Sequence, residues 1–191
     1  MLVFDSVTAH RSVEQGCFDD SRVECKVANA LEFLKDSTEL YDVIIGDLTD
    51  PTTEGPSIHL FEAEYFAQVK MRLRPGGFFS IQAGSVSLVE EPSLHARIHN
   101  TLRTVFSCVE SFASFIPSYG TPLGFCIATD FTGKDLLDPV PDPSSVLSQQ
   151  LASSARAMDT RFYRGLFGIP KSVRAAIDEE RGIVAAGKHG T

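Results

Sequence analysis

The stretch YDVIIGDLTDP (residues 41–51) decides the fold class and marks the candidate site. Its first half, 41–46, is a short and nearly continuous apolar run, which is typical of a strand buried in a parallel sheet. Two carboxylates, Asp47 and Asp50, follow directly. Because ligands of open α/β folds bind beyond the carboxyl ends of the strands, we expect both at the mouth of the sheet. There, two anions attract a polycation and accept a proton from an amine; the alternative is a helix cap and an Asp-Pro turn.

Strand-like and helix-like patterns alternate outward from this stretch. We expect further strands at 22–27, 78–82, 109–116 and 124–129, and helices at 6–14, 30–35, 59–73 and 94–106. This order predicts an α/β sandwich with a mostly parallel sheet. Residues 131–156, which are rich in Pro, Ser and Asp, predict a linker. Two short helical patterns on either side of Pro170 predict a helical extension that packs on the main domain or on another subunit.

Composition narrows the function classes. The chain has 191 residues, of which 43% are hydrophobic and 22% charged, and a net charge of -8. These values exclude wholesale disorder, and the acidic balance disfavours nucleic acid and anionic lipid as partners. No apolar run is long enough for a membrane helix, and no signal peptide precedes the first strand, so we expect a cytoplasmic protein. Its four cysteines lack the spacing of zinc or redox sites and are expected to be small buried residues.

Other polar residues stand where strands end. Gln82 and Tyr119 each follow or end a strand and are candidates for ligand binding; the alternatives are a loop cap and a half-buried surface tyrosine. Asn29 is a candidate for reading an adenine edge, although a helix N-cap is the better interpretation from its position. His95 and His99 have helical i, i+4 spacing but no third ligand nearby. We expect this pair to face solvent, and we predict no metal site.

An ordered set of motifs resembles the polyamine aminopropyltransferases, that is, the spermidine, spermine and thermospermine synthases. The set spans about residues 18–130 and comprises FDDSRV (18–23), Asn29-Ala30, YDVIIGDLTDP (41–51), RPGGFFSIQAGS (74–85) and IPSYGTPLGF (116–125). The GDLTDP and QAG forms and the tail FGIPKSVRAAIDEERGI (167–183) look closest to thermospermine synthase. The resemblance implies a Rossmann-like, class I methyltransferase-type fold.

The resemblance also implies a reaction. An amine of putrescine or spermidine attacks the propyl carbon of decarboxylated S-adenosylmethionine, which is a co-substrate, so no resident cofactor is expected. By this resemblance Asp47 accepts the proton, Asp50 holds an amine of the acceptor, and Tyr119 and Gln82 line the acceptor channel. Family members are commonly dimers or tetramers, so a homo-oligomer is expected.

The donor side departs from the family pattern. Asn29 and Ala30 occupy the family's adenine site, where Asn replaces an acidic residue, and Pro56 and Leu60 are expected to border the adenine pocket. The family's N-terminal β-domain and Gly-rich loop have no counterpart in this sequence. We therefore expect residues 1–130 to form a partial catalytic domain, followed by the linker (131–156) and the helical extension (157–191). We also expect this polypeptide alone to bind the donor poorly.

Two other functions remain open. One is a catalytically dead relative that acts as a partner subunit of a complete synthase. The other is a small-molecule methyltransferase on the same fold, although methyl transfer needs no pair of carboxylates to hold a cation.

Overall fold

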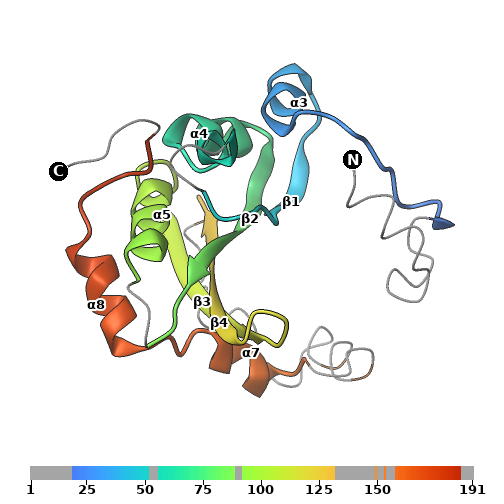
Figure 1. Ribbon diagram of the computed structural model, residues 1–191. Coiled ribbons are helices and arrows are strands. Elements are labelled where there is room, and N and C mark those ends of the chain that lie inside the picture. Colours follow the sequence, from blue (N-terminus) through green and yellow to red (C-terminus); the bar gives the residue numbers. More distant parts are fainter. Residues whose placement is uncertain are drawn as a thin grey trace.

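The computed structural model describes residues 19–51, 56–88, 92–131 and 158–185, together with residues 149 and 153. This part of the chain forms a four-stranded sheet with flanking helices, which confirms the α/β class (Figure 1). The predicted helix at 6–14 lies outside the described residues, as does the predicted linker apart from three of its positions.

The sheet is mixed rather than mostly parallel. Its strands, in the spatial order β1-β2-β4-β3, are β1 (Tyr41–Gly46), β2 (Leu73–Ser85), β4 (Thr121–Thr129) and β3 (Cys108–Ile116). Only β1 and β2 are parallel, and β4 runs antiparallel to both of its neighbours. The reason is the short turn 117–120, in which Gly120 adopts a φ of 66°. This turn folds β4 back along β3 and inserts it beside β2.

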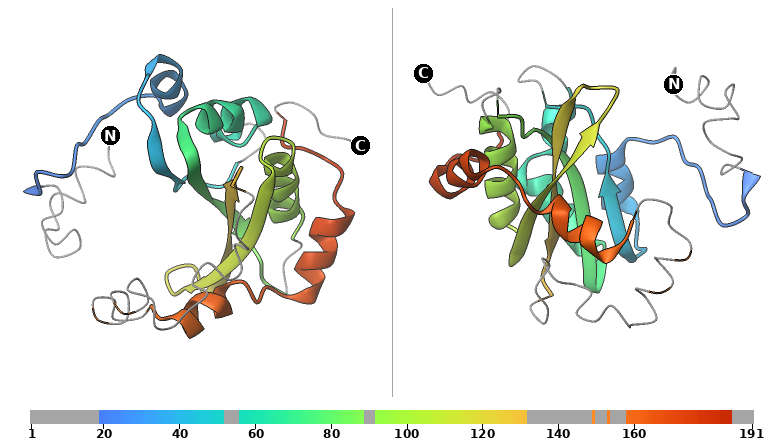
Figure 2. Two further views of the ribbon diagram at one scale, coloured as in Figure 1. Left: turned by 180° about the vertical axis from the view of Figure 1, so that it is seen from behind. Right: turned by 90° about the horizontal axis from the view of Figure 1, so that it is seen from below.

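Helices cover the sheet, and two of them follow its last strand in the sequence. They are α3 (Ala30–Asp36), the 3-10 helix η2 (Pro56–Leu60), α4 (Ala63–Met71), α5 (Ser93–Arg103), α7 (Thr160–Leu166) and α8 (Lys171–Glu179). In the ribbon views α4 and α5 lie together against the sheet, and α8 packs on the outer side of α5 (Figures 1 and 2). The single helix predicted at 59–73 is therefore wrong: a 3-10 turn precedes α4, and Leu73 already pairs with Tyr41 in the sheet. No helix in the described part of the chain is long and apolar enough to cross a bilayer.

Two strand predictions fail in part. Residues 22–27 form no strand, and Val27 is 83% exposed, because no described strand lies beside them to complete a ladder. The strand β1 has the predicted bounds but is not buried: Val43 and Ile45 are 55% and 73% exposed. It is the edge strand of the described sheet, and the face that carries these two side chains is uncovered.

The core lies between the sheet and helices α4 and α5. Alternate residues of β2, including Phe79 and Ile81, face these helices and are buried against Phe66, Ile98 and Leu102. The opposite set of β2 side chains points away from the helices, and the candidate site lies on that side.

The cysteines do not behave as one class. Cys126 is buried, Cys108 is half-buried and Cys25 is exposed, whereas Cys17 lies outside the described residues. The prediction that all four are buried is therefore wrong at Cys25, which belongs to the segment 22–27 that forms no strand.

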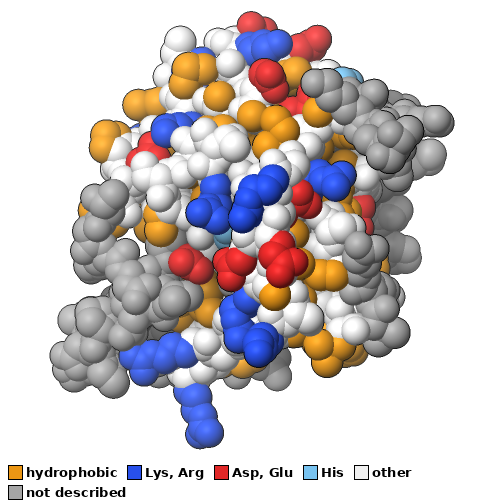
Figure 3. Space-filling view, turned by 90° about the vertical axis from the view of Figure 1, so that its left-hand side faces the viewer, with side chains coloured by type: hydrophobic (Ala, Val, Ile, Leu, Met, Phe, Trp, Pro, Cys, Tyr) orange, Lys and Arg blue, Asp and Glu red, His pale blue; other side chains and the backbone are white. Residues whose placement is uncertain are grey.

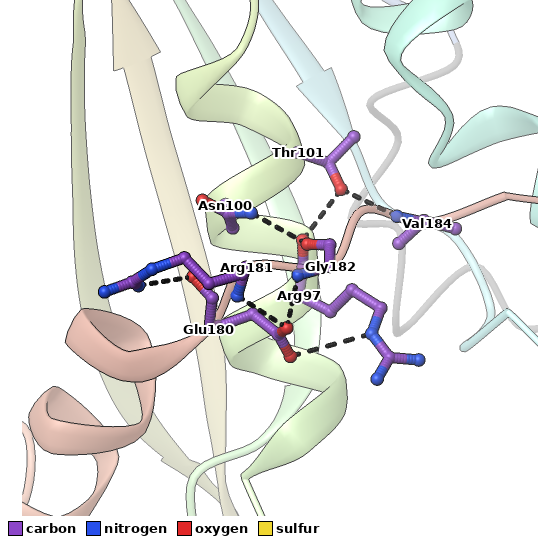
Figure 4. Close-up of polar contacts among 7 residues, drawn as sticks. All are labelled: Arg97, Asn100, Thr101, Glu180, Arg181, Gly182 and Val184. Atoms are coloured by element: carbon purple, nitrogen blue, oxygen red, sulfur yellow. Dashed lines mark hydrogen bonds and ion pairs between the residues drawn. The ribbon is translucent and has the colours of Figure 1, made fainter. Parts of the chain in front are cut away.

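The C-terminal extension packs on the main domain. After α8 the chain crosses α5, where Asn100 Nδ2 donates to the Gly182 carbonyl (2.8 Å) and Thr101 Oγ1 accepts the Val184 amide (2.9 Å), as Figure 4 shows. Val184 is buried in the core. The Glu180 carboxylate caps the turn by accepting the Gly182 amide (2.6 Å). Basic and acidic side chains are intermixed on this side of the molecule, so no single sign of charge dominates it (Figure 3).

Candidate functional site

A cavity of about 600 Å³ opens beyond the carboxyl end of β1. Its walls come from β1 and the loop that follows, from β2 and from the β3–β4 hairpin. The structure brings Asp47, Asp50, Gln82 and Tyr119 together in its lining, although they are up to 72 positions apart in the chain. The apolar part of the wall is formed by Ile45, Leu48, Ile116, Leu123 and Phe125.

The two carboxylates take their places from the end of β1. Gly46 is buried against Ile81, and a Cβ at this position would lie 3.2 Å from the Ile81 side chain, so the strand approaches β2 closely at that point. The chain then leaves the sheet, and both Asp47 and Asp50 are exposed to the cavity mouth. No described helix begins at either residue, so neither is a helix cap in this part of the structure.

Gln82 has an unusual hydrogen-bonding state. Its side chain is 8% exposed, and Nε2 donates to Asp50 Oδ1 at 2.6 Å. Its Oε1 atom is buried and has no hydrogen-bond partner. A buried amide oxygen without a donor costs about 1–3 kcal/mol. Gln82 is also among the residues that line the cavity.

The electrostatics of the cavity favour a cation. Two carboxylates line it, and no Lys, Arg or His is among the described lining residues. Tyr119, which is 69% exposed, stands on the hairpin turn at the rim. Anionic groups beside an apolar wall suit a ligand with ammonium ends and a hydrocarbon stem.

The predicted donor residues lie elsewhere. Asn29 is the N-cap of α3, where Oδ1 accepts the Leu31 amide at 3.0 Å, so the helix-cap interpretation is confirmed. Ala30 begins the same helix, and Leu60 packs against the core. The side chain of Pro56 is outside the described residues. The described residues therefore do not bring this set to the cavity that Asp47 and Asp50 line.

The prediction that His95 and His99 face solvent is wrong. They are 0% and 6% exposed, because they share the sheet-facing side of α5 with Ile98 and Leu102. This 95, 98, 99, 102 spacing was the signal for burial that the sequence contained. Burial lowers the pKa of both imidazoles to about 4. No group of three or more His, Cys, Asp or Glu side chains in the described part is placed to hold a metal ion.

Comparison with known proteins identifies the family. Residues 4–134 match the spermine/spermidine synthase domain. The chain belongs to the spermine/spermidine synthase family. The resemblance found in the motifs is thereby confirmed.

Two members of the spermine/spermidine synthase family show how similar the chain is to its relatives. It is 41% identical over 174 residues to a polyamine aminopropyltransferase of Synechococcus sp. (strain JA-2-3B'a(2-13)), covering 88% of this chain and 54% of the relative. It is 29% identical over 129 residues to the thermospermine synthase ACAULIS5 of Arabidopsis thaliana, covering 67% and 38%. The chain spans about half the length of the curated relatives that it matches most fully.

A solved structure supports the fold. The spermidine synthase of Thermotoga maritima superposes with a TM-score of 0.69 at 22% identity, over 88% of this chain and 54% of that one. This likeness confirms the Rossmann-like fold expected from the motifs.

Proposed function

We propose that this chain carries the acceptor-binding and proton-accepting part of a polyamine aminopropyltransferase. The observation that carries the proposal is the Gln82–Asp50 pair: a buried amide clamps one carboxylate and leaves its own oxygen without a donor, in a cavity that holds a second carboxylate and no described cation. An ammonium group supplies both the missing donor and the missing positive charge.

The residues then divide the work of the reaction. A polyamine arrives as an ammonium ion, because alkylamines have a pKa near 10 and carry no free lone pair when protonated. Asp50, held by Gln82, binds one amine, and Asp47 accepts the proton from the amine that reacts. The freed nitrogen forms a bond to the propyl carbon of decarboxylated S-adenosylmethionine. The carbon–sulfur bond breaks, and its electron pair leaves with methylthioadenosine.

The chemistry requires little else from the protein. The sulfonium is a good leaving group, so correct placement of nitrogen and carbon accounts for most of the remaining acceleration. The donor acts as a co-substrate and leaves as product. Tyr119 at the rim and the apolar wall hold the hydrocarbon stem of the acceptor.

The test is to incubate the full chain with putrescine or spermidine and decarboxylated S-adenosylmethionine. We expect spermidine to bind, as measured by calorimetry. Because this polypeptide is expected to bind the donor poorly, we expect only slow formation of methylthioadenosine and of a polyamine lengthened by one aminopropyl group, both quantified by mass spectrometry. Activity with S-adenosylmethionine instead would indicate a methyltransferase. Spermidine binding by calorimetry without any product would indicate a partner subunit. If the chain neither binds spermidine nor forms product, the proposal is overturned.

A further inference from the structure

Behind the acceptor cavity, on the α5 side of the sheet, lies a buried chain of hydrogen bonds. His95 Nδ1 lies 3.1 Å from the Ala83 carbonyl, and His95 Nε2 lies 2.9 Å from Ser111 Oγ. The same hydroxyl lies 2.8 Å from His99 Nδ1. Both rings and Ser111 are at least nine-tenths buried. The chain therefore joins α5 to β2 and β3 at three points.

The partners determine where each proton lies. A carbonyl only accepts, so neutral His95 carries its proton on Nδ1, and its Nε2 accepts from the Ser111 hydroxyl. Because the Ser111 hydroxyl donates its single proton to His95, it accepts a hydrogen bond from His99 Nδ1. His99 therefore also carries its proton on Nδ1. The resulting order runs in one direction, from His99 through Ser111 and His95 to the Ala83 carbonyl.

This series of hydrogen bonds ends at the Ala83 carbonyl, where β2 is irregular. The register between β2 and β4 shifts between Gln82 and Ser85, and Gly84 in this interval has a φ of 79°. Such bulges redirect neighbouring side chains. The ring of His95 fills the space beside the bulge so tightly that a Cβ on Gly124 would lie 2.4 Å from its Nδ1. Gln82 immediately precedes the carbonyl that His95 holds.

We infer that the His99–Ser111–His95 chain is a positioning device that holds the bulge after Gln82 and thereby keeps the Gln82–Asp50 pair in place for the acceptor amine. This inference rests on the proposed function for the role of the pair, but the placement itself is independent of it. His95 and Ser111 touch no substrate and act only through Gln82.

The first test is the tautomer of the two rings. Nitrogen-15 NMR of the full chain at neutral pH is expected to show both histidines protonated on Nδ1 and unprotonated on Nε2. A proton on Nε2 of either ring would contradict the proposed order. This measurement needs no substrate, so it separates the failure of this inference from the failure of the proposed function.

The second test compares variants on one helix. In His95→Leu the donor to Ala83 is lost, whereas in His95→Asn the amide places an N–H group near the position of Nδ1–H. We expect His95→Leu and Ser111→Ala to shift the Gln82 side-chain amide resonance and to raise KM for the polyamine about tenfold, the scale of one lost buried hydrogen bond. His95→Asn is expected to recover most of this loss, and KM for the donor is expected to stay unchanged.

The matched control is Thr101→Val, which is fully buried on the same helix and loses its hydrogen bond to the Val184 amide. It is expected to lower stability but to leave the Gln82 resonance and the acceptor KM unchanged. If Thr101→Val changes the Gln82 resonance and the acceptor KM as Ser111→Ala does, the histidine–serine hydrogen bonds are only structural and the inference is wrong. If His95→Leu does not fold, Ser111→Ala carries the comparison alone, and unchanged Gln82 signals in it overturn the inference.

Discussion

Asp47 and Asp50 differ in what holds them, and this difference separates their expected roles. Asp50 accepts a short hydrogen bond from a buried amide, which fixes its direction. No described side chain donates to Asp47. A carboxylate without a donor keeps its lone pairs available for a proton, whereas a clamped carboxylate is suited to binding.

The first prediction concerns Asp47→Asn. We expect kcat to fall by about 10²-fold or more, because the amide cannot accept the ammonium proton. Methylthioadenosine release measures the effect. The control is Asp42→Asn, which removes an exposed carboxylate of β1 that pairs with Arg74 of β2 and is expected to leave kcat unchanged. Equal turnover of Asp47→Asn and the wild type would end the assignment of the base.

The second prediction concerns Asp50→Asn. Loss of the charge is expected to raise KM for the acceptor about tenfold, on the scale of a hydrogen bond to a charged group, with a smaller effect on kcat. Initial rates over a range of spermidine concentrations separate the two constants. A loss confined to kcat would instead assign Asp50 to proton transfer.

At the scale of the elements, β4 makes a close backbone approach: of the described glycines, Gly124 leaves the least room for a side chain. Gly124 lies between Leu123 and Phe125, which line the cavity, and its own missing side chain leaves room for the His95 ring on the other face. The strand thus meets the cavity on one side and the buried histidine on the other.

The third prediction follows from this contact. Gly124→Ala is expected to lower the free energy of unfolding by about 1–3 kcal/mol, as overpacking of a filled core does. Gly165→Ala in α7 is the matched control: its Cβ meets nothing within 4 Å, and alanine favours a helix by about 0.5–1 kcal/mol, so stability is expected to rise. Urea unfolding measures both. A neutral Gly124→Ala would show that the ring moves aside at no cost.

For the whole molecule, the buried histidines link stability to pH. His99 lines a cavity whose charged residues are Arg103, Glu110, Arg174 and Asp178. Burial is the largest cause of the lowered pKa of both rings, from 6.5 to about 4, and charge repulsion with His95 and Arg103 adds to it for His99. Because these pKa values lie below those of the unfolded chain, the unfolded state binds more protons in this interval.

The fourth prediction is therefore a loss of stability in acid. The contribution of the neutral imidazoles is complete above pH 6.5 and falls toward pH 4, by up to about 1.4 kcal/mol per pH unit for each ring. Urea unfolding from pH 7.5 to 4 measures the slope. His59→Gln, which removes an exposed imidazole, is expected to keep the slope. A flat profile between pH 6.5 and 4 would show that the rings are charged in the fold.

The sequence by itself determined the elements whose signals are local. The apolar run of β1, the Asn29 cap of α3 and the two helices around Pro170 each depend on neighbouring residues, and the structure has all three. The ordered motifs likewise identified the family. These features need only short-range hydrogen bonding and side-chain periodicity, which any stretch of sequence displays.

Only the tertiary structure decided which residues meet. The inserted antiparallel β4, the exposure of Val43 and Ile45, and the burial of His95 depend on which strand lies beside which, and strand order is not a local property. The same holds for the 2.6 Å contact between Gln82 and Asp50, which are 32 positions apart. Neighbours in space set burial and hydrogen-bond partners, and the free energy that selects them belongs to the assembled core and sheet.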